Sequence, residues 1–399
     1  MTWCEACDWN VDPGKPDEAP GRMEAFRRRL AKSYGEKLYA EVAAGGSLAP
    51  HRDPAGVFAL VLALAVHGFT AAVALGGLLL ITVAGGVAFC VLGVVLLLLA
   101  WVLRPRMARL PEDLPVLRRA DAPELFALVD EVAALTGTTG VRAVVVDGDF
   151  NASVSTYGIR RHRVLSLGLG AWESLTPQER IALLGHELGH FANGDLRHGL
   201  VVSNALRSLD TWRYLVAAQS RPQTLMDWLL NLLYLPPRLV VNGLLALLDR
   251  LTLRSAQRAE YLADTLAARV GSTASAVALM DKLLVWESGE GWLRREVNAV
   301  RTKGSRAAGR DTNADELWEG LAAHMASVPD RERERLRRVG ALRGHSVDSS
   351  HPPTHLRRAC LLAVPPTGAV LNPTDERLAA VSTELSTARA TVTRMIVRG

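Results

Sequence analysis

The sequence predicts an α+β fold that is mainly helical, contains a small sheet, and carries an N-terminal transmembrane helical hairpin. The run from Pro54 to Leu103 contains no Asp, Glu, Lys or Arg, and it is long enough for two membrane helices of about 20 residues each. Two runs rich in β-branched and apolar residues, 141–148 and 162–170, predict strands. The mean hydropathy of +0.12 is high for a purely soluble protein.

We place the hairpin at residues 57–78 and 86–103, joined by a short glycine-rich turn. Lys and Arg residues flank the apolar run on both sides, whereas the turn is uncharged. Because cytoplasmic flanks carry the excess of Lys and Arg, both ends of the hairpin are expected in the cytoplasm, with Trp101 at the interface. The run starts too far from Met1 for a signal peptide. The alternative is a buried helical hairpin of a soluble protein.

The chain divides into segments that differ in composition. The net charge of +5 is too small for this length to indicate a nucleic-acid partner. The apolar run 225–250 is interrupted by Pro236-Pro237 and Arg238. It is therefore expected to contact the membrane as a broken span, a re-entrant hairpin or a surface helix, or to cover a cleft. The charged run 329–340 is interpreted as a solvated helix face. The predicted segments are a basic N-terminal segment with a C-x-x-C motif (1–53), the hairpin (54–104), a globular domain (105–365) and a C-terminal helical extension (366–399).

The four cysteines indicate a reducing compartment rather than a disulfide framework. Only Cys4 and Cys7 are close in sequence, in the stretch CEACDWN. Their C-x-x-C spacing is that of a zinc knuckle, although a closed structural zinc site needs four ligands and the chain has no second C-x-x-C. Cys4 and Cys7 are therefore candidates for a second metal site, and a redox motif is the alternative.

The stretch IALLGHELGHFANGD contains the chemistry that the sequence shows most clearly. Thr176, Pro177 and Glu179 form a capping box with proline at the first helical position, so we expect a helix from Pro177 to about residue 192. His186 and His190 are four residues apart and share one helix face, where both imidazoles can bind one zinc ion. Glu187 lies beside them within reach of a water molecule. The alternative is a pair of core histidines with a paired glutamate.

A catalytic zinc ion needs a third protein ligand on another element. The stretch RSAQRAEYLADTLAARVG supplies Glu260 and Asp264, four apart on a helix that Gly271 can close. Glu260 is the expected third ligand. Asp264 is expected to accept the second N–H of a ligating histidine, which would fix the tautomer of that ring.

GHELGHFANGD together with AEYLAD resembles the integral membrane zinc endopeptidases of the HtpX type, gluzincins related to the CAAX prenyl protease. FNASVS and SSHPPTHLRR are similar to two further motifs of this family. The resemblance implies a zincin-like catalytic domain in which one Zn²⁺ is held by His186, His190 and Glu260. It further implies Glu187 as general base, Asp264 behind the ligands, and His351 and Arg357 near the active site, where either orients substrate or stabilises the oxyanion. Asn151 and Ala152 would lie on an edge strand that binds the substrate backbone.

The expected function is that of a zinc endopeptidase in the cytoplasmic membrane, multi-pass, with its catalytic domain facing the cytoplasm. Its partners are expected to be polypeptides and the lipid bilayer; the family resemblance implies misfolded membrane or cytosolic-facing segments as substrates. Two alternatives stay open: a membrane-tethered scaffold or stress sensor with a structural zinc site, and a prenyl-protein processing enzyme. The sequence predicts no oligomeric state.

Overall fold

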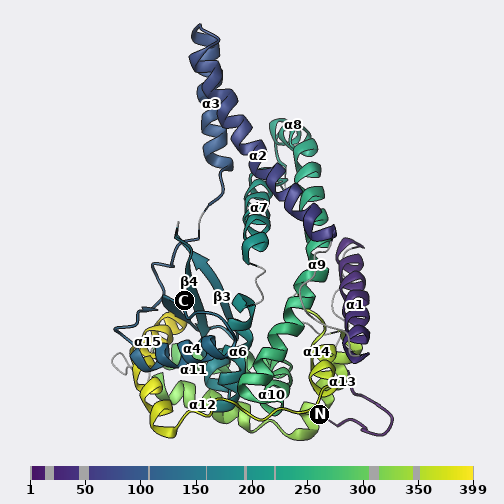
Figure 1. Cartoon of the computed structure of the whole chain (residues 1–399), viewed down its shortest axis with the longest axis vertical. Helices are drawn as coiled ribbons and strands as arrows, with labels where there is room; N and C mark the ends of the chain where they lie inside the picture. The colour runs from purple at the N-terminus through teal and green to yellow at the C-terminus, as the bar shows by residue number, and fades with distance from the viewer. Residues whose placement is uncertain are drawn as a thin grey trace. The chain divides into compact units, whose positions relative to one another are not determined.

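The computed structural model describes residues 2–13, 22–44, 54–106, 108–158, 160–192, 196–219, 222–304, 314–344 and 351–398 (Figure 1). Within these ranges the chain is mainly helical and has one small mixed sheet, so the mainly helical α+β prediction is confirmed. The chain divides into two compact units. The first contains Met1–Ala49, Ala108–Asn193 and Ala256–Gly399, and the second contains Pro50–Met107 and Gly194–Ser255. The four-segment division made from composition remains a prediction.

The sheet belongs to the first unit and has the strand order β1-β2-β4-β3. β2 and β4 are parallel, and the other two pairs are antiparallel. Both strands expected from the sequence are present, and the segment between them forms a third, β3, at the edge of the sheet. The strands are β1 (Val116–Leu117), β2 (Ala143–Asp147), β3 (Ala152–Tyr157) and β4 (His162–Gly168).

Helices surround this sheet in the first unit. α4 begins at a proline, as a first helical position allows, and buries its apolar face; Gly137 follows it with φ +78°, a left-handed conformation that glycine adopts without strain. The helices are α1 (Arg22–Ala43), α4 (Pro123–Leu135), α5 (Leu169–Ser174), α6 (Pro177–Ala192), α10 (Thr273–Leu283), α11 (Trp286–Gly304), α12 (Ala314–Ala326), α13 (Asp330–Arg343), α14 (Thr354–Leu362), α15 (Asp375–Arg398) and the part of α9 (Leu235–Gly271) from Ala256 onward.

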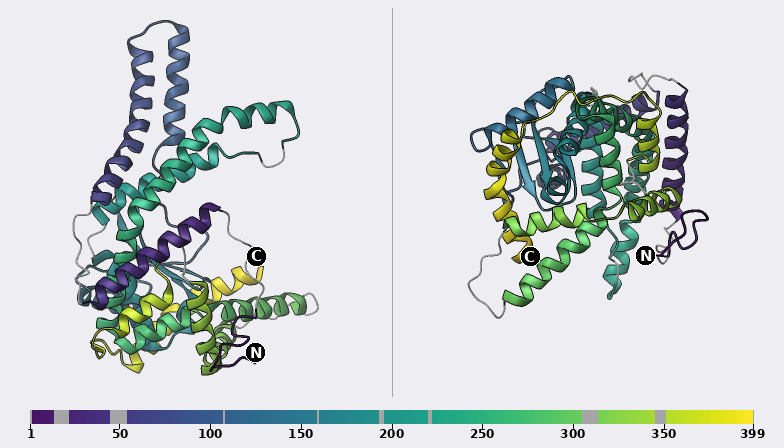
Figure 2. Two further views of the ribbon diagram at one scale, coloured as in Figure 1. Left: turned by 90° about the vertical axis from the view of Figure 1, so that its right-hand side faces the viewer. Right: turned by 90° about the horizontal axis from the view of Figure 1, so that it is seen from below.

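The second unit contains α2 (Pro54–Thr82) and α3 (Val87–Leu103), which lie side by side as a helical hairpin (Figure 2). The two backbones meet where a Cβ on Gly77 would lie 2.8 Å from the carbonyl oxygen of Gly93. Most apolar side chains of the hairpin are exposed, as lipid contact requires. α2 is long and apolar enough to cross a membrane, whereas α3 has 17 residues and is shorter than the usual span of about 20.

The second unit also contains α7 (Leu196–Leu215), α8 (Leu225–Leu233) and the first part of α9. α8 and α9 pass the length and hydropathy test for a span only together, and they are bent by 45° at Tyr234. Pro236 and Pro237 lie in the first turn of α9, where the missing N–H groups cost no helical hydrogen bond. The described chain thus has one candidate span, or two if the bent pair counts as one. Membrane contact by residues 225–250 remains a prediction.

α13 differs from its interpretation as a solvated face. Its arginines contact the N-terminal segment 2–13, and Arg335 is buried with its Nη1 donating to the carbonyl oxygen of Val11 at 2.7 Å. The alternating Arg and Glu residues of α13 do not by themselves predict that a distant segment of the chain binds these arginines.

Candidate metal centre

The helix that carries His186 and His190 begins where the sequence predicts. The Thr176 backbone N–H donates to Glu179 Oε2 at 2.8 Å, and the Glu179 N–H donates to Thr176 Oγ1 at 3.4 Å, which completes the capping box. The helix then runs through the core, and every residue from 181 to 189 is buried. This burial explains the apolar sequence around the polar residues.

Small residues set the distance between α6 and α9. A Cβ on Gly185 would lie 3.1 Å from Ala267 Cα, and a Cβ on Gly189 would lie 3.1 Å from Ala263 Cα. Residue numbers increase along α6 while the numbers of their partners decrease along α9. The two helices are therefore antiparallel and closely packed. One turn beyond this seam, α9 places Glu260 opposite the two histidines.

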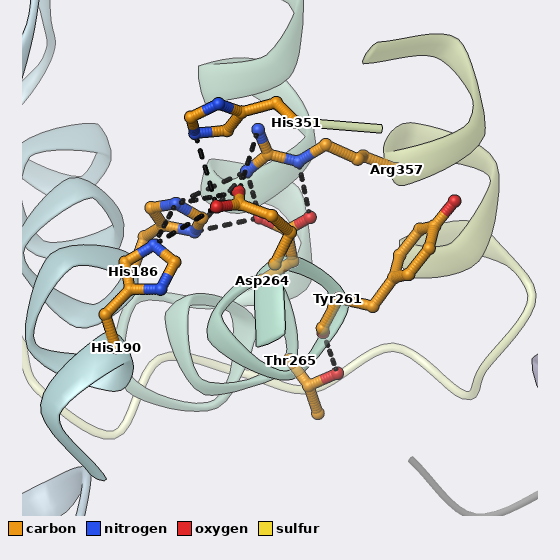
Figure 3. Close-up of polar contacts among 8 residues, drawn as sticks. His186, His190, Tyr261, Asp264, Thr265, His351 and Arg357 are labelled. Carbon is orange, nitrogen blue, oxygen red and sulfur yellow. Dashed lines mark hydrogen bonds and ion pairs between the residues drawn. The ribbon is translucent and has the colours of Figure 1, made fainter. Parts of the chain in front are cut away.

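The three expected zinc ligands converge on one point (Figure 3). His186 Nε2 lies 3.2 Å from His190 Nε2, and each of these nitrogens lies 3.5 Å from an oxygen of Glu260. Ligand atoms bound to one tetrahedral zinc ion at 2.0–2.1 Å are separated by about 3.4 Å. The spacing of the donor atoms therefore suits a zinc ion.

The chemistry of this donor set also fits zinc. Two imidazoles and one carboxylate are a usual protein ligand set for a catalytic zinc ion. Glu260 Oε2 is a buried acceptor with no hydrogen bond among the described residues, and His186 Nε2 and Arg357 Nη1 each lie 3.5 Å from it. A buried carboxylate oxygen without a hydrogen bond is costly, and a bound cation would satisfy it.

Glu187 is buried beside this cluster, with 7% of the residue exposed. Burial raises the pKa of its carboxyl to about 7, against the opposing influence of the charge on His186. Burial and the neighbouring His186 lower the pKa of His190 to about 4, which favours the neutral imidazole that binds metal. A carboxyl that titrates near neutral pH can both accept and return a proton.

Asp264 lies between a histidine and an arginine. Its Oδ1 is 3.0 Å from His186 Nδ1, and the Arg357 guanidinium donates to both of its oxygens at 2.6 and 2.8 Å. Although burial acts to raise the pKa of Asp264, Arg357 and His186 outweigh it and hold that pKa well below its usual range. The ionised Asp264 can accept from Nδ1 of His186, which leaves Nε2 directed at the metal position.

His351 and Arg357, which the sequence did not distinguish, have different surroundings. Arg357 is 2% exposed and engaged by Asp264, with its Nη1 3.5 Å from Glu260 Oε2. The side chain of His351 is 22% exposed, and its Nε2 lies 3.3 Å from Glu260 Oε1. His186, Glu260 and His351 also each offer a ligand atom within 4.8 Å of the others, so His351 borders the metal position.

Asn151 and Ala152 lie at the start of β3 rather than among the metal-binding groups. The Asn151 carbonyl oxygen accepts from the Gly168 N–H at 3.0 Å, and Ala152 packs in an apolar cluster with Ala182 and Leu183 of α6. β3 pairs only with β4 in the described sheet, so its other edge carries backbone groups with no strand partner. Cys4 and Cys7 lie in the N-terminal segment 2–13, which contacts α13 through Trp3, Asp8 and Val11.

Two structural supports of the candidate centre are not predicted by the sequence. One is the seam of Gly185, Gly189, Ala263 and Ala267, whose signal is small residues four apart on two helices. The other is α1, which packs on α14: a Cβ on Gly35 would lie 3.3 Å from Leu356, and the Tyr261 hydroxyl donates to the Gly35 carbonyl oxygen at 3.4 Å. No local pattern in residues 22–43 points to this contact.

These features define a candidate metal centre of the H-E-x-x-H class on a mainly helical fold. The model of peptidase family M48 matches residues 120–364, more than half of the chain. The chain therefore belongs to peptidase family M48, and the resemblance inferred from its motifs is confirmed.

Curated relatives match over shorter stretches. A protease HtpX homolog of Moorella thermoacetica is 38% identical over 76 residues, which cover 19% of this chain and 25% of the relative. The homolog of Thermococcus kodakarensis is 28% identical over 100 residues, 24% of this chain and 34% of the relative. The homolog of Syntrophobacter fumaroxidans is 30% identical over 80 residues, which cover 20% of this chain and 28% of the relative. The chain thus matches a quarter to a third of the length of these relatives. No solved structure matches it significantly.

Proposed function

We propose that this chain is a membrane-anchored, zinc-dependent endopeptidase. The observation that carries the proposal is the convergence of His186, His190 and Glu260 donor atoms within 3.5 Å, beside the buried Glu187. Membership of peptidase family M48 supports peptide-bond hydrolysis as the reaction. A purely structural zinc site would have no use for a buried carboxyl with a pKa near 7.

His186, His190 and Glu260 would hold the zinc ion. When bound, zinc supplies Lewis acidity that polarises a peptide carbonyl and makes a water molecule easier to deprotonate. Glu187 accepts the proton of the attacking water and then donates a proton to the amine that leaves. Asp264 holds the ring of His186 in one orientation, and Arg357 keeps Asp264 ionised.

His351 and Arg357 have different roles in this proposal. Arg357 is a positioning residue, because its guanidinium is buried and occupied by Asp264 and Glu260. His351 borders the metal position with part of its ring exposed, so it is the group that can donate to the developing oxyanion of a substrate.

The free edge of β3 supports binding of an extended peptide. Asn151 and Ala152 begin this strand, and a substrate can add to its open edge through backbone hydrogen bonds, which demand no particular side-chain sequence. This mode suits unfolded polypeptides as a substrate class. Misfolded membrane proteins and exposed cytosolic segments are the proposed physiological substrates, and the exposed apolar hairpin α2–α3 supports the membrane location. The basic flanks of the hairpin support a catalytic domain in the cytoplasm.

The deciding experiment compares the purified, zinc-loaded chain in mild detergent with Glu187→Gln. Both are assayed for cleavage of casein as an unfolded protein, and bound zinc is counted in both. We expect the wild type to cut and the variant to keep its zinc while its rate falls about 10²- to 10⁴-fold.

A second probe in the same assay is a peptide that ends in a prenylated cysteine. Cleavage confined to this peptide would favour prenyl-protein processing. If wild type and variant both hold zinc and neither cuts any substrate, the proposal is wrong and a scaffold with structural zinc is the better explanation.

A further inference from the structure

Residues 2–13 form a compact turn that α13 holds in place. Trp3 is 2% exposed, and its ring lies below the guanidinium groups of Arg331 and Arg338, 5.8 and 5.1 Å from the ring centroid. Arg331 also donates to the Trp3 carbonyl oxygen, and Arg338 donates to Asp8 Oδ1 at 2.7 Å. These contacts hold the turn against α13, so α13 helps to fix its conformation.

The backbone of this turn folds back on itself at Cys4. The Cys4 N–H donates to the Trp9 carbonyl oxygen at 3.0 Å, and the Val11 N–H donates to the Asp8 carbonyl oxygen at 3.1 Å. Asp8, directly after Cys7, has φ 56°, a left-handed conformation that aspartate adopts more readily than most residues and that closes the turn here. The side chain of Cys7 and the backbone N–H groups of Ala6 and Cys7 lower the pKa of the Cys4 thiol. A lowered pKa favours the thiolate, the form of cysteine that binds metal.

Neither cysteine forms a disulfide, and Cys7 is exposed. A tetrahedral zinc ion needs four ligands, and this turn provides two thiols. The chain has only two further cysteines: Cys90 lies within the apolar hairpin, and Cys360 is buried beside Leu38 and Tyr261. Four thiolates around one Zn²⁺ leave a net charge of −2, which nearby arginines would offset, and Arg331 already acts on the Cys4 sulfur.

We propose that Cys4 and Cys7 form half of a four-thiolate zinc site, and that a second copy of this chain supplies the other half. The two identical turns would meet at the ion as in a two-fold symmetric dimer, in which each copy uses the same surface. Each copy brings its own Arg331, so the positive charge near the site increases together with the thiolate charge, whereas Arg338 is already paired with Asp8 and Glu334. The site is separate from the His186, His190 and Glu260 cluster and does not depend on the proposed peptidase activity.

The test uses the full chain in detergent, reduced and then loaded with zinc, with protein mass measured by light scattering and zinc by elemental analysis. We expect a dimer with about 1.5 zinc ions per chain, one at the metal centre and half of one at the cysteine turn. The double variant Cys4→Ser/Cys7→Ser should be a monomer with about one zinc ion. Cys90→Ser is the matched control and should keep both the dimer and the extra zinc.

Cobalt(II) provides a readout that the His-and-Glu centre cannot mimic, because only thiolates give a sulfur-to-cobalt charge-transfer band in the near ultraviolet. The band should appear in the wild type and in Cys90→Ser, and disappear in the double variant. The proposal is overturned if the reduced chain takes up no metal at these cysteines, or if it binds one ion per turn as a monomer. It is equally overturned if Cys4 and Cys7 form a disulfide with each other that survives reduction and zinc loading.

Discussion

Arg357 donates two parallel hydrogen bonds to Asp264, from Nε to Oδ2 at 2.8 Å and from Nη2 to Oδ1 at 2.6 Å. Both side chains are only 2% exposed. The same Asp264 oxygen that accepts from Nη2 lies 3.0 Å from His186 Nδ1. A bidentate pair of this kind fixes the plane of the carboxylate as well as its charge. The orientation of His186, a proposed metal ligand, is therefore set through Asp264 by an arginine of α14.

Replacing Asp264 with Asn should weaken zinc binding. The amide is neutral, so His186 loses its charged acceptor, and outer partners of metal ligands typically contribute 10- to 100-fold in affinity. We expect a loss of about that size in a competition titration with a chelator. Asp281→Asn is the matched control, since Asp281 also pairs with two arginines, Arg337 and Arg358, but is not in the metal centre. Equal zinc affinity in Asp264→Asn and wild type would contradict this role.

His351→Ala should reduce turnover and leave zinc in place. If His351 stabilises the oxyanion, its loss removes a donor that acts in the transition state, which costs about 10²- to 10³-fold in kcat. KM should change little, because such an interaction strengthens only as the reaction proceeds. Steady-state kinetics on an unfolded substrate, together with a zinc count, provide the check. Loss of the zinc ion in this variant would instead make His351 a metal ligand.

Gly189→Leu should separate α6 and α9, the two helices that hold the proposed metal ligands. A Cβ at Gly189 meets the backbone of Ala263 at 3.1 Å, so the larger side chain cannot be accommodated by a rotamer change alone. Overpacking of this kind costs about 1–3 kcal/mol, and thermal unfolding should show it. In Gly291→Leu the nearest neighbour is the flexible end of Arg295 at 3.5 Å, so this control should unfold at the wild-type temperature or above. A stable Gly189→Leu chain with normal zinc affinity would count against the seam.

Leu64→Arg should weaken membrane retention. Leu64 is 53% exposed near the middle of α2, the helix long enough to span a bilayer. An arginine near the middle of a span costs about 2.5–3.5 kcal/mol on insertion scales. The fraction of protein that resists alkaline carbonate extraction should therefore fall. Val83→Arg, in the turn after α2, is the control and should remain in the membrane fraction. If the wild type itself is released by carbonate, the hairpin does not anchor the chain.

Local signals predicted the elements that are shaped by local forces. The capping box of Thr176 and Glu179 placed the start of α6, and the four-residue spacing of Glu260 and Asp264 placed both carboxylates on one face of α9. The strand runs and the apolar hairpin were readable for the same reason. Helix caps and apolar periodicity depend on neighbours within a few residues.

The features that were not predicted depend on contacts between distant residues. In the sheet, β4 lies between β2 and β3, and no sequence pattern within those strands predicts this order. The different surroundings of His351 and Arg357 follow from where Asp264 lies in space, although the two residues are close in sequence. The sequence predicted solvated arginines on α13, because their partners, such as the Val11 carbonyl oxygen, lie more than 300 residues away in the sequence.

The packing of α1 on α14 has a consequence for the order of events during synthesis. α14 carries Arg357, and its packing with Gly35 and Leu38 joins two segments that lie far apart in the sequence. The apolar hairpin leaves the ribosome long before α14 does. Because domains fold as units when their sequence is complete, Asp264 stays without its arginine until α14 has emerged. The apolar hairpin is thus available to a membrane before the candidate metal centre can be completed.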